Sequence, residues 1–424
     1  MTAKPGAIEW RRRIPGGPDG RRMLAVALVD RVGSGLWASV SVLYFTYISG
    51  LSLAEVGTLA AVSGAIGIAG APLGGRIADR LPLTRVLVAL QLLRALASFA
   101  LLTTHDYALL LAVSAVGALG DRAANVLTKL YATRIAGPDR VHYQALNRTI
   151  ANAGWALGGL AAAAALALGT TTAYRWLLAG DALSFVAAAL LTLRCGEPPS
   201  PSRAVADWRT EPKTEKPANP WRDRTYLAYV ATDTVLFLDD AVFKVGLPLW
   251  IAHSDRIPHG LAPLLLVVNN VMVVGLQVPL ARFGTTSRAA RRLLVPLSAA
   301  FALGGIAMAL SATGGTATGI LLLTAAAAAF TVAEMLHATV SWELSVALAP
   351  GTAQGAYLGV HGLAQSAQRS IGPLAVTTAI ATGPLGWTAF GTLIALTCAI
   401  QHRLVRDRLP HPPLSVAPIT VSEN

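Results

Sequence analysis

Ionisable side chains recur inside long apolar stretches of this sequence, where they could take up and release protons. The acidic residues in these stretches are Asp30, Asp121, Asp239, Asp240 and Glu334. Inserting a charged side chain near the centre of a bilayer costs about 2.5–3.5 kcal/mol on insertion scales. Such a side chain is therefore expected to form an ion pair, to contact water or to serve the function. Loss of water favours the protonated form of a carboxylate. We therefore expect these five residues to include the proton-coupling site.

Basic, aromatic and amide side chains in the same stretches could contact these acids or a solute. The expected charge partners are Arg31, Arg122, Lys244 and Arg369. Asp240 precedes Lys244 by four residues, which is the favourable order for a pair on one helix. For any single acid, a static ion pair between helices is an equally good explanation. The residues expected to stack on a substrate or hydrogen-bond to it are Trp37, Tyr44, Asn152, Trp155, Phe237, Asn270, Gln277, His361 and Gln365.

Twelve apolar stretches carry these residues. The chain of 424 residues is 54% hydrophobic and 13% charged, which is more apolar surface than a soluble core can hide. A helix needs about 20 residues to cross a hydrocarbon layer roughly 30 Å thick. We expect an all-α membrane protein whose last helix is apolar and lies at the lipid edge. The helices are expected near residues 23–49, 53–75, 84–104, 107–134, from 143, 174–194, 225–251, 261–281, 290–311, 316–348, 352–382 and 385–404.

Polar side chains share one face of the first stretch. Asp30, Ser34, Trp37, Ser41 and Tyr44 follow at steps of four, three, four and three residues, which places all five on one side of a helix. This face is expected to contact protein or water and not lipid.

The net charge of +12 comes from basic residues in alternate connections between the stretches. They lie before the first stretch and after the second, fourth, sixth and eighth, whereas the other connections hold only Arg175 and Arg256. Cytosolic loops of membrane proteins are enriched in Lys and Arg, so both termini are expected in the cytosol. Charge spread over separate loops argues against a nucleic-acid partner.

Residues 196–224 are rich in proline and charge and lack a sustained apolar period. They are expected to be a cytosolic linker between two six-helix bundles. The resulting division is a tail at 1–22, bundles at 23–195 and 225–404, and a second tail at 405–424.

The segment 75–85, GRIADRLPLTR, lies between the second and third stretches. It resembles the loop between helices 2 and 3 of the major facilitator superfamily, in which a glycine, an aspartate-arginine pair and a later basic residue recur. The matching residues are Gly75, Ala78, Asp79, Arg80 and Arg85, while Pro82 and Leu83 depart from the pattern. The resemblance implies two six-helix bundles around a cavity that opens alternately to the two sides of the membrane.

The resemblance also implies a conformational role for Asp79. It would hold the cytosolic side shut by contacting the start of the helix at 352–382 and a nearby arginine. A carboxylate suits this place because the amides at a helix N-terminus favour negative charge. The alternative is that Arg76, Arg80 and Arg85 anchor the loop to anionic lipid.

Glu334 lies in a second region of resemblance. Together with the Ala-Pro pair at 349–350 and the Gly-Ala-Tyr run at 355–357, it resembles helices 10 and 11 of proton-coupled drug exporters of the same superfamily. The resemblance implies that Glu334 handles protons. The fifth stretch has Gly154 and Gly158 but lacks the proline that often follows glycine there in such exporters.

These features predict a secondary transporter that uses proton antiport to export an amphipathic small molecule, drug-like or a natural product. The alternative is a proton-coupled symporter that imports a small solute. The missing proline and the buried basic residues favour this alternative, since the basic residues would suit an anion. An enzyme is not expected, because the sequence has no Ser/His/Asp grouping, HExxH motif or phosphate-binding loop.

The remaining expectations concern location and partners. No removable signal peptide is recognisable. The use of Ala, Gly and Arg fits a GC-rich bacterial genome, so we expect a multi-pass monomer in a bacterial cytoplasmic membrane. Its expected partners are a small-molecule substrate, protons and lipid. Neither a cofactor nor a metal is expected, since His337 and His361 lack further ligands, and no disulfide is expected between Cys195 and Cys398.

Overall fold

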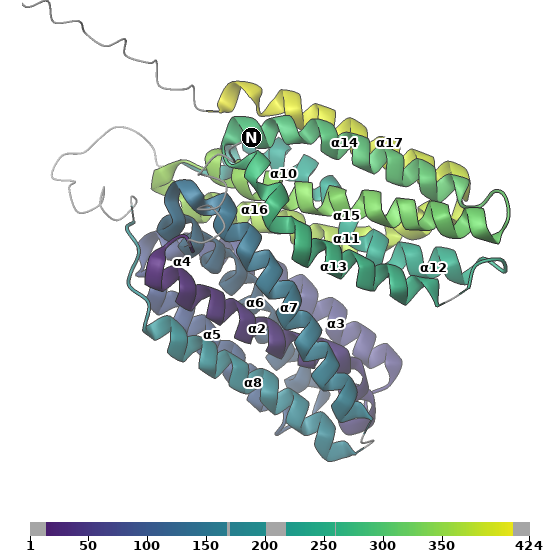
Figure 1. Cartoon of the computed structure of the whole chain (residues 1–424). Coiled ribbons are helices and arrows are strands. Elements are labelled where there is room, and N and C mark those ends of the chain that lie inside the picture. Colours follow the sequence, from purple (N-terminus) through teal and green to yellow (C-terminus); the bar gives the residue numbers. More distant parts are fainter. Residues whose placement is uncertain (1–13, 168–169, 201–217, 259, 410–424) are drawn as a thin grey trace, which may run out of the picture.

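The computed structural model describes residues 14–167, 170–200, 218–258 and 260–409, which form helices joined by short connections (Figure 1). No strand occurs in this part of the chain. Most of the expected N-terminal tail, residues 201–217 of the expected linker and residues 410–424 lie outside the described residues.

The N-terminal bundle holds the first six membrane-length segments. They are α2 (Gly17–Leu43) with the π-helical turn η1 (Tyr44–Ile48), α3 (Leu53–Ile68) with α4 (Gly70–Arg80), α5 (Leu83–Leu101), α6 (Tyr107–Ala136), α7 (Arg140–Leu166) and α8 (Thr171–Leu193). α2 begins before residue 23, where the apolar stretch starts. Its first turn is polar and contains Pro18, whose fixed φ suits a helix start.

The C-terminal bundle holds the other six segments. They are α10 (Arg224–Leu236), α11 (Asp239–Ala241), η4 (Val242–Gly246) and α12 (Leu247–Ala252) in one interrupted span, then α13 (Leu261–Ala281), α14 (Ser287–Leu310), α15 (Thr316–Ala347), α16 (Gln354–Ala381) and α17 (Pro384–Leu404). Short 3-10 turns complete the chain: η2 (Gly137–Asp139), η3 (Pro220–Arg222), η5 (Arg282–Gly284), η6 (Gly351–Ala353) and η7 (Arg406–Arg408).

Twelve membrane-length segments follow from these helices. Nine helical stretches of the described residues are long and apolar enough to cross a membrane, and one of them, Tyr107–Leu166, is divided at Gly137–Asp139 into α6 and α7. The interrupted α10–α12 and the more polar α16 complete the set. The expected all-α membrane fold with two six-helix bundles is confirmed. Helices prevail because lipid cannot satisfy backbone N–H and C=O groups.

Two spans are broken where one helix was expected. The second span breaks at Ala69, because Pro72 has no N–H to continue the hydrogen-bond ladder. The seventh span, expected as one helix near residues 225–251, is divided at Phe237 and Leu238 and then passes through the π-helical η4 to Pro248 in α12. A π turn and a proline are both recognised causes of helix kinks.

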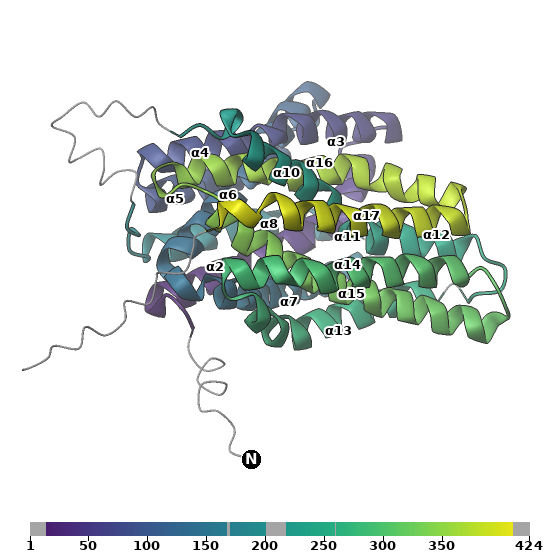
Figure 2. The same ribbon diagram turned by 90° about the horizontal axis from the view of Figure 1, so that it is seen from above.

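Each bundle has its own packed core. In the C-terminal bundle, α14 packs between α15 and α17 (Figures 1 and 2), around the fully buried Phe301, Phe330 and Trp387. The expectation that α17 is apolar and lies at the lipid edge is wrong for one face. Gln401 of α17 is fully buried and points into the bundle, where it bonds to Asp233 at 3.3 Å.

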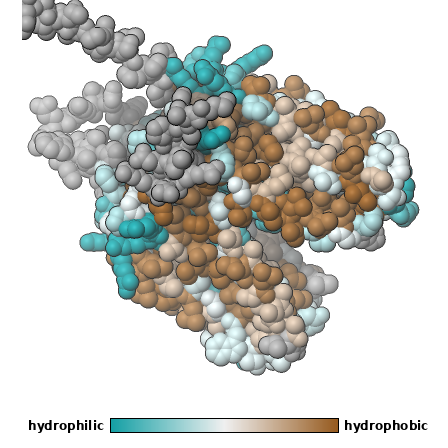
Figure 3. All heavy atoms as spheres, in the orientation of Figure 1, coloured by the Kyte–Doolittle hydropathy of each residue, from teal (hydrophilic) through white to brown (hydrophobic). Residues whose placement is uncertain are grey.

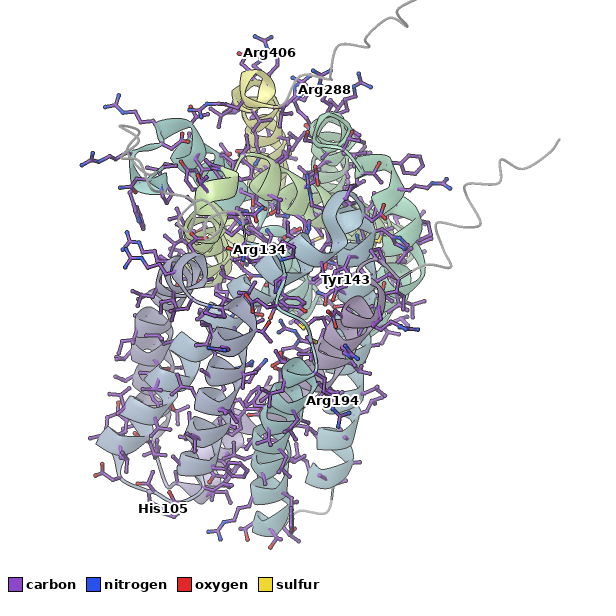
Figure 4. All side chains as sticks on the ribbon, turned by 90° about the vertical axis from the view of Figure 1, so that its left-hand side faces the viewer. His105, Arg134, Tyr143, Arg194, Arg288 and Arg406 are labelled. Carbon is purple, nitrogen blue, oxygen red and sulfur yellow. The ribbon has the colours of Figure 1, made fainter. Side chains whose placement is uncertain are left out.

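The two bundles meet at one end and separate toward the other (Figure 1). We call the meeting end the basic face, because Arg134, Arg194, Arg288 and Arg406 lie there (Figure 4). The opposite end, which carries the α5–α6 connection with His105 and the α12–α13 connection, is called the far face. The space-filling view shows a notch between the bundles that opens toward the far face (Figure 3).

Candidate functional site

The basic face is closed by a contact between α4 and α16. Asp79, at the end of α4, accepts hydrogen bonds from the backbone N–H groups of Gly355 (2.9 Å) and Ala356 (2.8 Å) at the start of α16. Arg134 of α6 lies 3.9 Å from the same carboxylate. This is the contact that the resemblance implied, and Arg134 is the arginine involved. The carboxylate satisfies amides that the first turn of a helix leaves free.

Glycines allow this contact to form. The backbones of Gly75 and Gly355 approach so closely that a Cβ atom on either residue would overlap the carbonyl oxygen of the other. A Cβ on Gly355 would also lie 2.7 Å from an oxygen of Asp79. Only glycine fits at these two positions while the bundles touch.

Further polar contacts join the bundles between the basic face and the middle of the molecule. Arg140 of α7 donates two hydrogen bonds of 2.7 Å to Glu343 of α15, in the bidentate geometry of a strong ion pair. Lys129 of α6 donates to the hydroxyl of Ser345 at 2.7 Å and lies over the ring of Trp342.

Glu334 makes the innermost of these contacts. Its carboxylate forms an ion pair with Arg148 of α7 and accepts a hydrogen bond of 2.8 Å from Asn269 of α13. The leading candidate for proton coupling is therefore held by a cation of the opposite bundle. Any change that protonates Glu334 would weaken a link between the two bundles.

Two cavities lie beyond these contacts. One, of about 250 Å³, is between the bundles and is lined by residues of α6, α7, α15 and α16, including Lys129, Arg148, Ser341 and His361. The other, of about 430 Å³, lies mainly within the N-terminal bundle toward the far face. Arg31 lines both cavities, so they are neighbours.

The cavity walls are basic. Arg31, Arg122, Lys129 and Arg148 line the smaller cavity, whose lining contains no acidic residue. Arg122 and Arg369 are expected from the sequence to pair with acids. Within the described part of the chain, however, neither they nor Lys129 lie within ion-pairing distance of a carboxylate. Arg122 and Arg369 are close enough to repel each other.

Two of the expected coupling acids are paired inside the N-terminal bundle. Arg94 of α5 bonds to Asp30 (2.6 Å) and to Asp121 (3.0 Å), and it is almost fully buried. Arg31 lies 3.9 Å from Asp30 and donates to Asn125 at 2.6 Å. A guanidinium between two carboxylates neutralises most of their charge and holds three helices together.

The other two expected coupling acids, Asp239 and Asp240, lie on α11. The predicted pair with Lys244 is present, with 2.8 Å between Asp240 and the ammonium group, but both side chains are well exposed. Asp239 is buried and lies 3.4 Å from Nδ1 of His337.

Asp233 organises a buried polar cluster in the C-terminal bundle. It is fully buried and bonds to His361 (2.8 Å), Ser341 (2.7 Å) and His337 (3.3 Å), and also to Gln401. These side chains come from α10, α15, α16 and α17. The cluster adjoins the smaller cavity, because Ser341 and His361 also line it.

The expected substrate-binding residues divide into two groups. The cavities are lined by Trp37, Trp155, Phe237, His361 and Gln365. The other four expected residues do not line either cavity. Tyr44 is buried and bonds to the carbonyl of Leu101, Gln277 donates to the carbonyl of Met335, Asn270 bonds within its own helix, and Asn152 lies elsewhere on α7.

The structure adds residues that the sequence pattern did not single out. Arg148, Asn269, Asp233 and Asp181 were not among the expected site residues. Asp181 is buried beside the larger cavity, and only one of its carboxylate oxygens is hydrogen-bonded within the described residues, to Ser98 at 3.0 Å. For Arg148, Asp233 and Asp181, the one signal in the sequence that points to a functional role is an ionisable side chain within an apolar stretch.

Comparisons with known proteins give a family and a set of similar folds. The Major Facilitator Superfamily model matches residues 23–373. Comparison with curated protein sequences gives no match. Similar structures include a bacterial homologue of the iron transporter ferroportin in its outward-facing state, with 15% identity, a TM-score of 0.65, and coverage of 91% of this chain and 98% of that chain.

Two further structures are similar over nearly the whole chain. The proton:xylose symporter XylE has 12% identity and a TM-score of 0.68, with 92% of this chain and 96% of that chain covered. FucP, in the outward conformation, has 17% identity and a TM-score of 0.66, with 93% and 100% covered. At these identities, the likeness concerns the fold.

Proposed function

Since the chain belongs to the major facilitator superfamily and is a multi-pass membrane transporter, we propose that it carries a small organic anion across the membrane together with protons. The observation that carries this proposal is a set of cations in the cavity walls that have no ion-paired carboxylate among the described residues, namely Arg122, Lys129 and Arg369. An unpaired cation in a membrane interior is costly, and an anionic ligand offsets that cost. Arginine also binds carboxylate and sulfonate oxygens in a bidentate way.

We propose that the basic face is cytosolic, as the positive-inside rule predicts for a bacterial cytoplasmic membrane. The structure is then the outward-open state of a monomer that works by alternating access. The contacts of Asp79, Arg140 and Arg148 close the cytosolic side, and the far face admits the solute.

Glu334 is proposed to couple protons to this movement. Its ion pair with Arg148 crosses the bundle interface, so that taking up a proton removes one attraction between the bundles. Asp30 and Asp121, which both pair with Arg94, remain candidates for proton coupling in the N-terminal bundle. Asp239 and Asp240 remain candidates in the C-terminal bundle.

A second candidate function, export of an amphipathic molecule, is supported by the aromatic wall of the larger cavity. Trp37, Phe45, Trp155 and Phe185 line it together with Arg369. Aromatic faces suit a flat apolar group, and nearby cations suit an acidic one. An anion with an aromatic part fits both observations.

The test is transport of naphthalene-2-sulfonate, a permanent anion, by protein reconstituted in vesicles. Uptake is expected to depend on a pH gradient across the vesicle membrane, with acid on the side of the anion. Arg122→Gln and Arg369→Gln are each expected to reduce uptake roughly tenfold, which corresponds to about 1.4 kcal/mol of lost binding. Arg288→Gln, which removes an exposed charge on the basic face, is the control and should transport normally (Figure 4).

A cationic probe, tetraphenylphosphonium, separates the two candidate functions. Gradient-driven movement of this cation without movement of the sulfonate would overturn the anion assignment and favour drug export. The neutral analogue naphthalene-2-sulfonamide should not accumulate, because it lacks the charge that the arginines recognise.

A further inference from the structure

Both ring nitrogens of His337 lie near carboxylate oxygens. Nε2 lies 3.3 Å from an oxygen of Asp233, and Nδ1 lies 3.4 Å from an oxygen of Asp239. An ionised carboxylate only accepts hydrogen bonds, and a neutral imidazole has one N–H. Both ring nitrogens can face carboxylates favourably only if both carry a proton. With Asp233 and Asp239 both ionised, His337 is therefore an imidazolium between them.

His361 lies between this buried group and the cavity. Its Nε2 donates to Asp233 at 2.8 Å, and its ring stacks on Tyr229. No hydrogen bond is present at the other ring nitrogen within the described residues, and the residue lines the smaller cavity. That nitrogen is the place where a proton from cavity water can bind.

The charges of the cluster leave room for one more proton. Asp233 and Asp239 carry two negative charges, and the imidazolium of His337 carries one positive charge. Protonation of His361 at Nδ1 would bring the net charge of the four side chains from minus one to zero. Loss of net charge favours this step in a buried site.

We propose that Asp233, Asp239, His337 and His361 form a proton-binding site of the C-terminal bundle, loaded from the cavity at His361. This inference rests on the proposed function only for its link to the anion. His361 and the cations Lys129 and Arg148 line the same cavity, so a bound anion and a proton on His361 attract each other. Such attraction is reciprocal: the anion promotes proton uptake, and the proton promotes anion binding.

The surroundings of the site come from several helices. Lys129 of α6, in the opposite bundle, attracts Asp233 and repels a proton on His361, so a bound anion that neutralises Lys129 would favour this proton. Ser341 of α15 and Gln401 of α17 donate hydrogen bonds to Asp233. Since Gln401 and Ser341 do not titrate, the acid-base groups that face His361 are Asp233, His337, Lys129 and the stacked Tyr229.

Nitrogen-15 NMR of the full chain in lipid vesicles, labelled at histidine, tests the charges directly and needs no substrate. At pH 7.5, we expect one imidazolium signal with both nitrogens protonated, which disappears in His337→Gln. On acidification, a second signal is expected that is absent in His361→Gln. His105→Gln, an exposed residue of the far face, is the matched control and should retain both signals (Figure 4).

A wild-type spectrum without imidazolium at pH 7.5 would overturn the proposal, whether or not the variants fold. A second arm measures proton influx with pyranine trapped inside vesicles while naphthalene-2-sulfonate enters. His361→Gln is expected to lower the number of protons that enter with each anion about tenfold, within the range of couplings between linked sites, and to weaken anion binding as well because the two are reciprocal. Unchanged proton influx in this variant would refute loading through His361. Absence of sulfonate transport by the wild type would instead count against the proposed function, and the NMR result would stand.

Discussion

At the scale of single residues, Glu334 differs from the other four expected coupling acids because its cation belongs to the opposite bundle. Asp30 and Asp121 are neutralised by Arg94 within one bundle, and Asp240 by Lys244 on the same chain segment. Those pairs can persist while the bundles move as rigid bodies. The pair of Glu334 with Arg148 cannot, since it must break when the bundles part at this level.

Glu334→Gln is therefore expected to uncouple transport from protons. Glutamine keeps the size and can still accept a hydrogen bond from Arg148, but it can neither carry the charge nor exchange the proton. Accumulation of naphthalene-2-sulfonate driven by a pH gradient should fall by roughly tenfold or more, while exchange at equal pH stays within about twofold. Radiotracer uptake in both modes measures the difference.

Glu343→Gln is the matched control for this experiment. It lies on the same helix and loses an ion pair of the same kind, with Arg140. It should change the rates of both modes together and retain the dependence on the gradient. Equal loss of gradient dependence in the two variants would show that Glu334 has no special role.

At the scale of elements, the approach of α4 to α16 depends on the missing side chains of Gly75 and Gly355. The contact places the carboxylate of Asp79 on two amides of the first turn of α16.

The first span of each bundle also contains a π-helical turn in its far-face half, η1 in one and η4 in the other. These turns reveal a structural correspondence between the bundles.

Gly75→Ala is expected to open the α4–α16 contact. The added methyl group would overlap the carbonyl oxygen of Gly355, so α4 must move and Asp79 loses its amides. Hydrogen exchange measured by mass spectrometry on residues 350–358 should accelerate about tenfold for each 1.4 kcal/mol lost. Gly57→Ala makes the same substitution on the same span where a Cβ meets open space, and it should leave exchange unchanged. If hydrogen exchange of residues 350–358 does not accelerate in Gly75→Ala, then α4 and α16 are not in close contact in the membrane.

At the scale of the whole molecule, the structure is a pair of bundles joined at the basic face and apart at the far face. Trp342, Val346 and Leu358 of the C-terminal bundle pack there into the apolar core of the N-terminal bundle. The polar contacts between the bundles include the Asp79 bonds, the Lys129 bond and the ion pairs of Arg140 and Arg148. Each offsets the desolvation of its charges only while the bundles touch. Loss of one or two of these contacts should therefore shift the equilibrium from the state that is open at the far face toward the state that is open at the basic face.

The double variant Asp79→Asn, Glu343→Gln is expected to shift the population toward closure of the far face. Spin labels on cysteines introduced at His105 and Asp255 report the far face, and labels at Arg194 and Arg288 report the basic face. The far-face distance should shorten and the basic-face distance lengthen in pulsed EPR. Native Cys195 and Cys398 are buried, so the introduced residues take the label.

Lys244→Gln is the control for the population shift, because its ion pair lies within the C-terminal bundle. Its distance distributions should match those of the unsubstituted protein. If the double variant also matches them, the contacts at the basic face do not hold the two bundles in this arrangement.

The sequence by itself determined the helices and the contacts that depend on local order. An apolar stretch of about 20 residues in lipid must be helical, since its backbone has no other partners there. Asp240 and Lys244 pair as predicted because four residues make one turn. The Asp79 contact followed from a motif that occupies a few consecutive residues.

Only the tertiary structure decided which ionisable side chains meet between helices. Arg94 and Asp30 are 64 residues apart, and Arg148 and Glu334 are 186 apart. Helical periodicity gives the face on which such a residue lies but not the helix that covers this face. The covering helix depends on how whole bundles pack. Only the tertiary structure therefore showed the partners of Asp233, the inward position of Gln401, and that Arg122 and Arg369 form no ion pair with any carboxylate of the described residues.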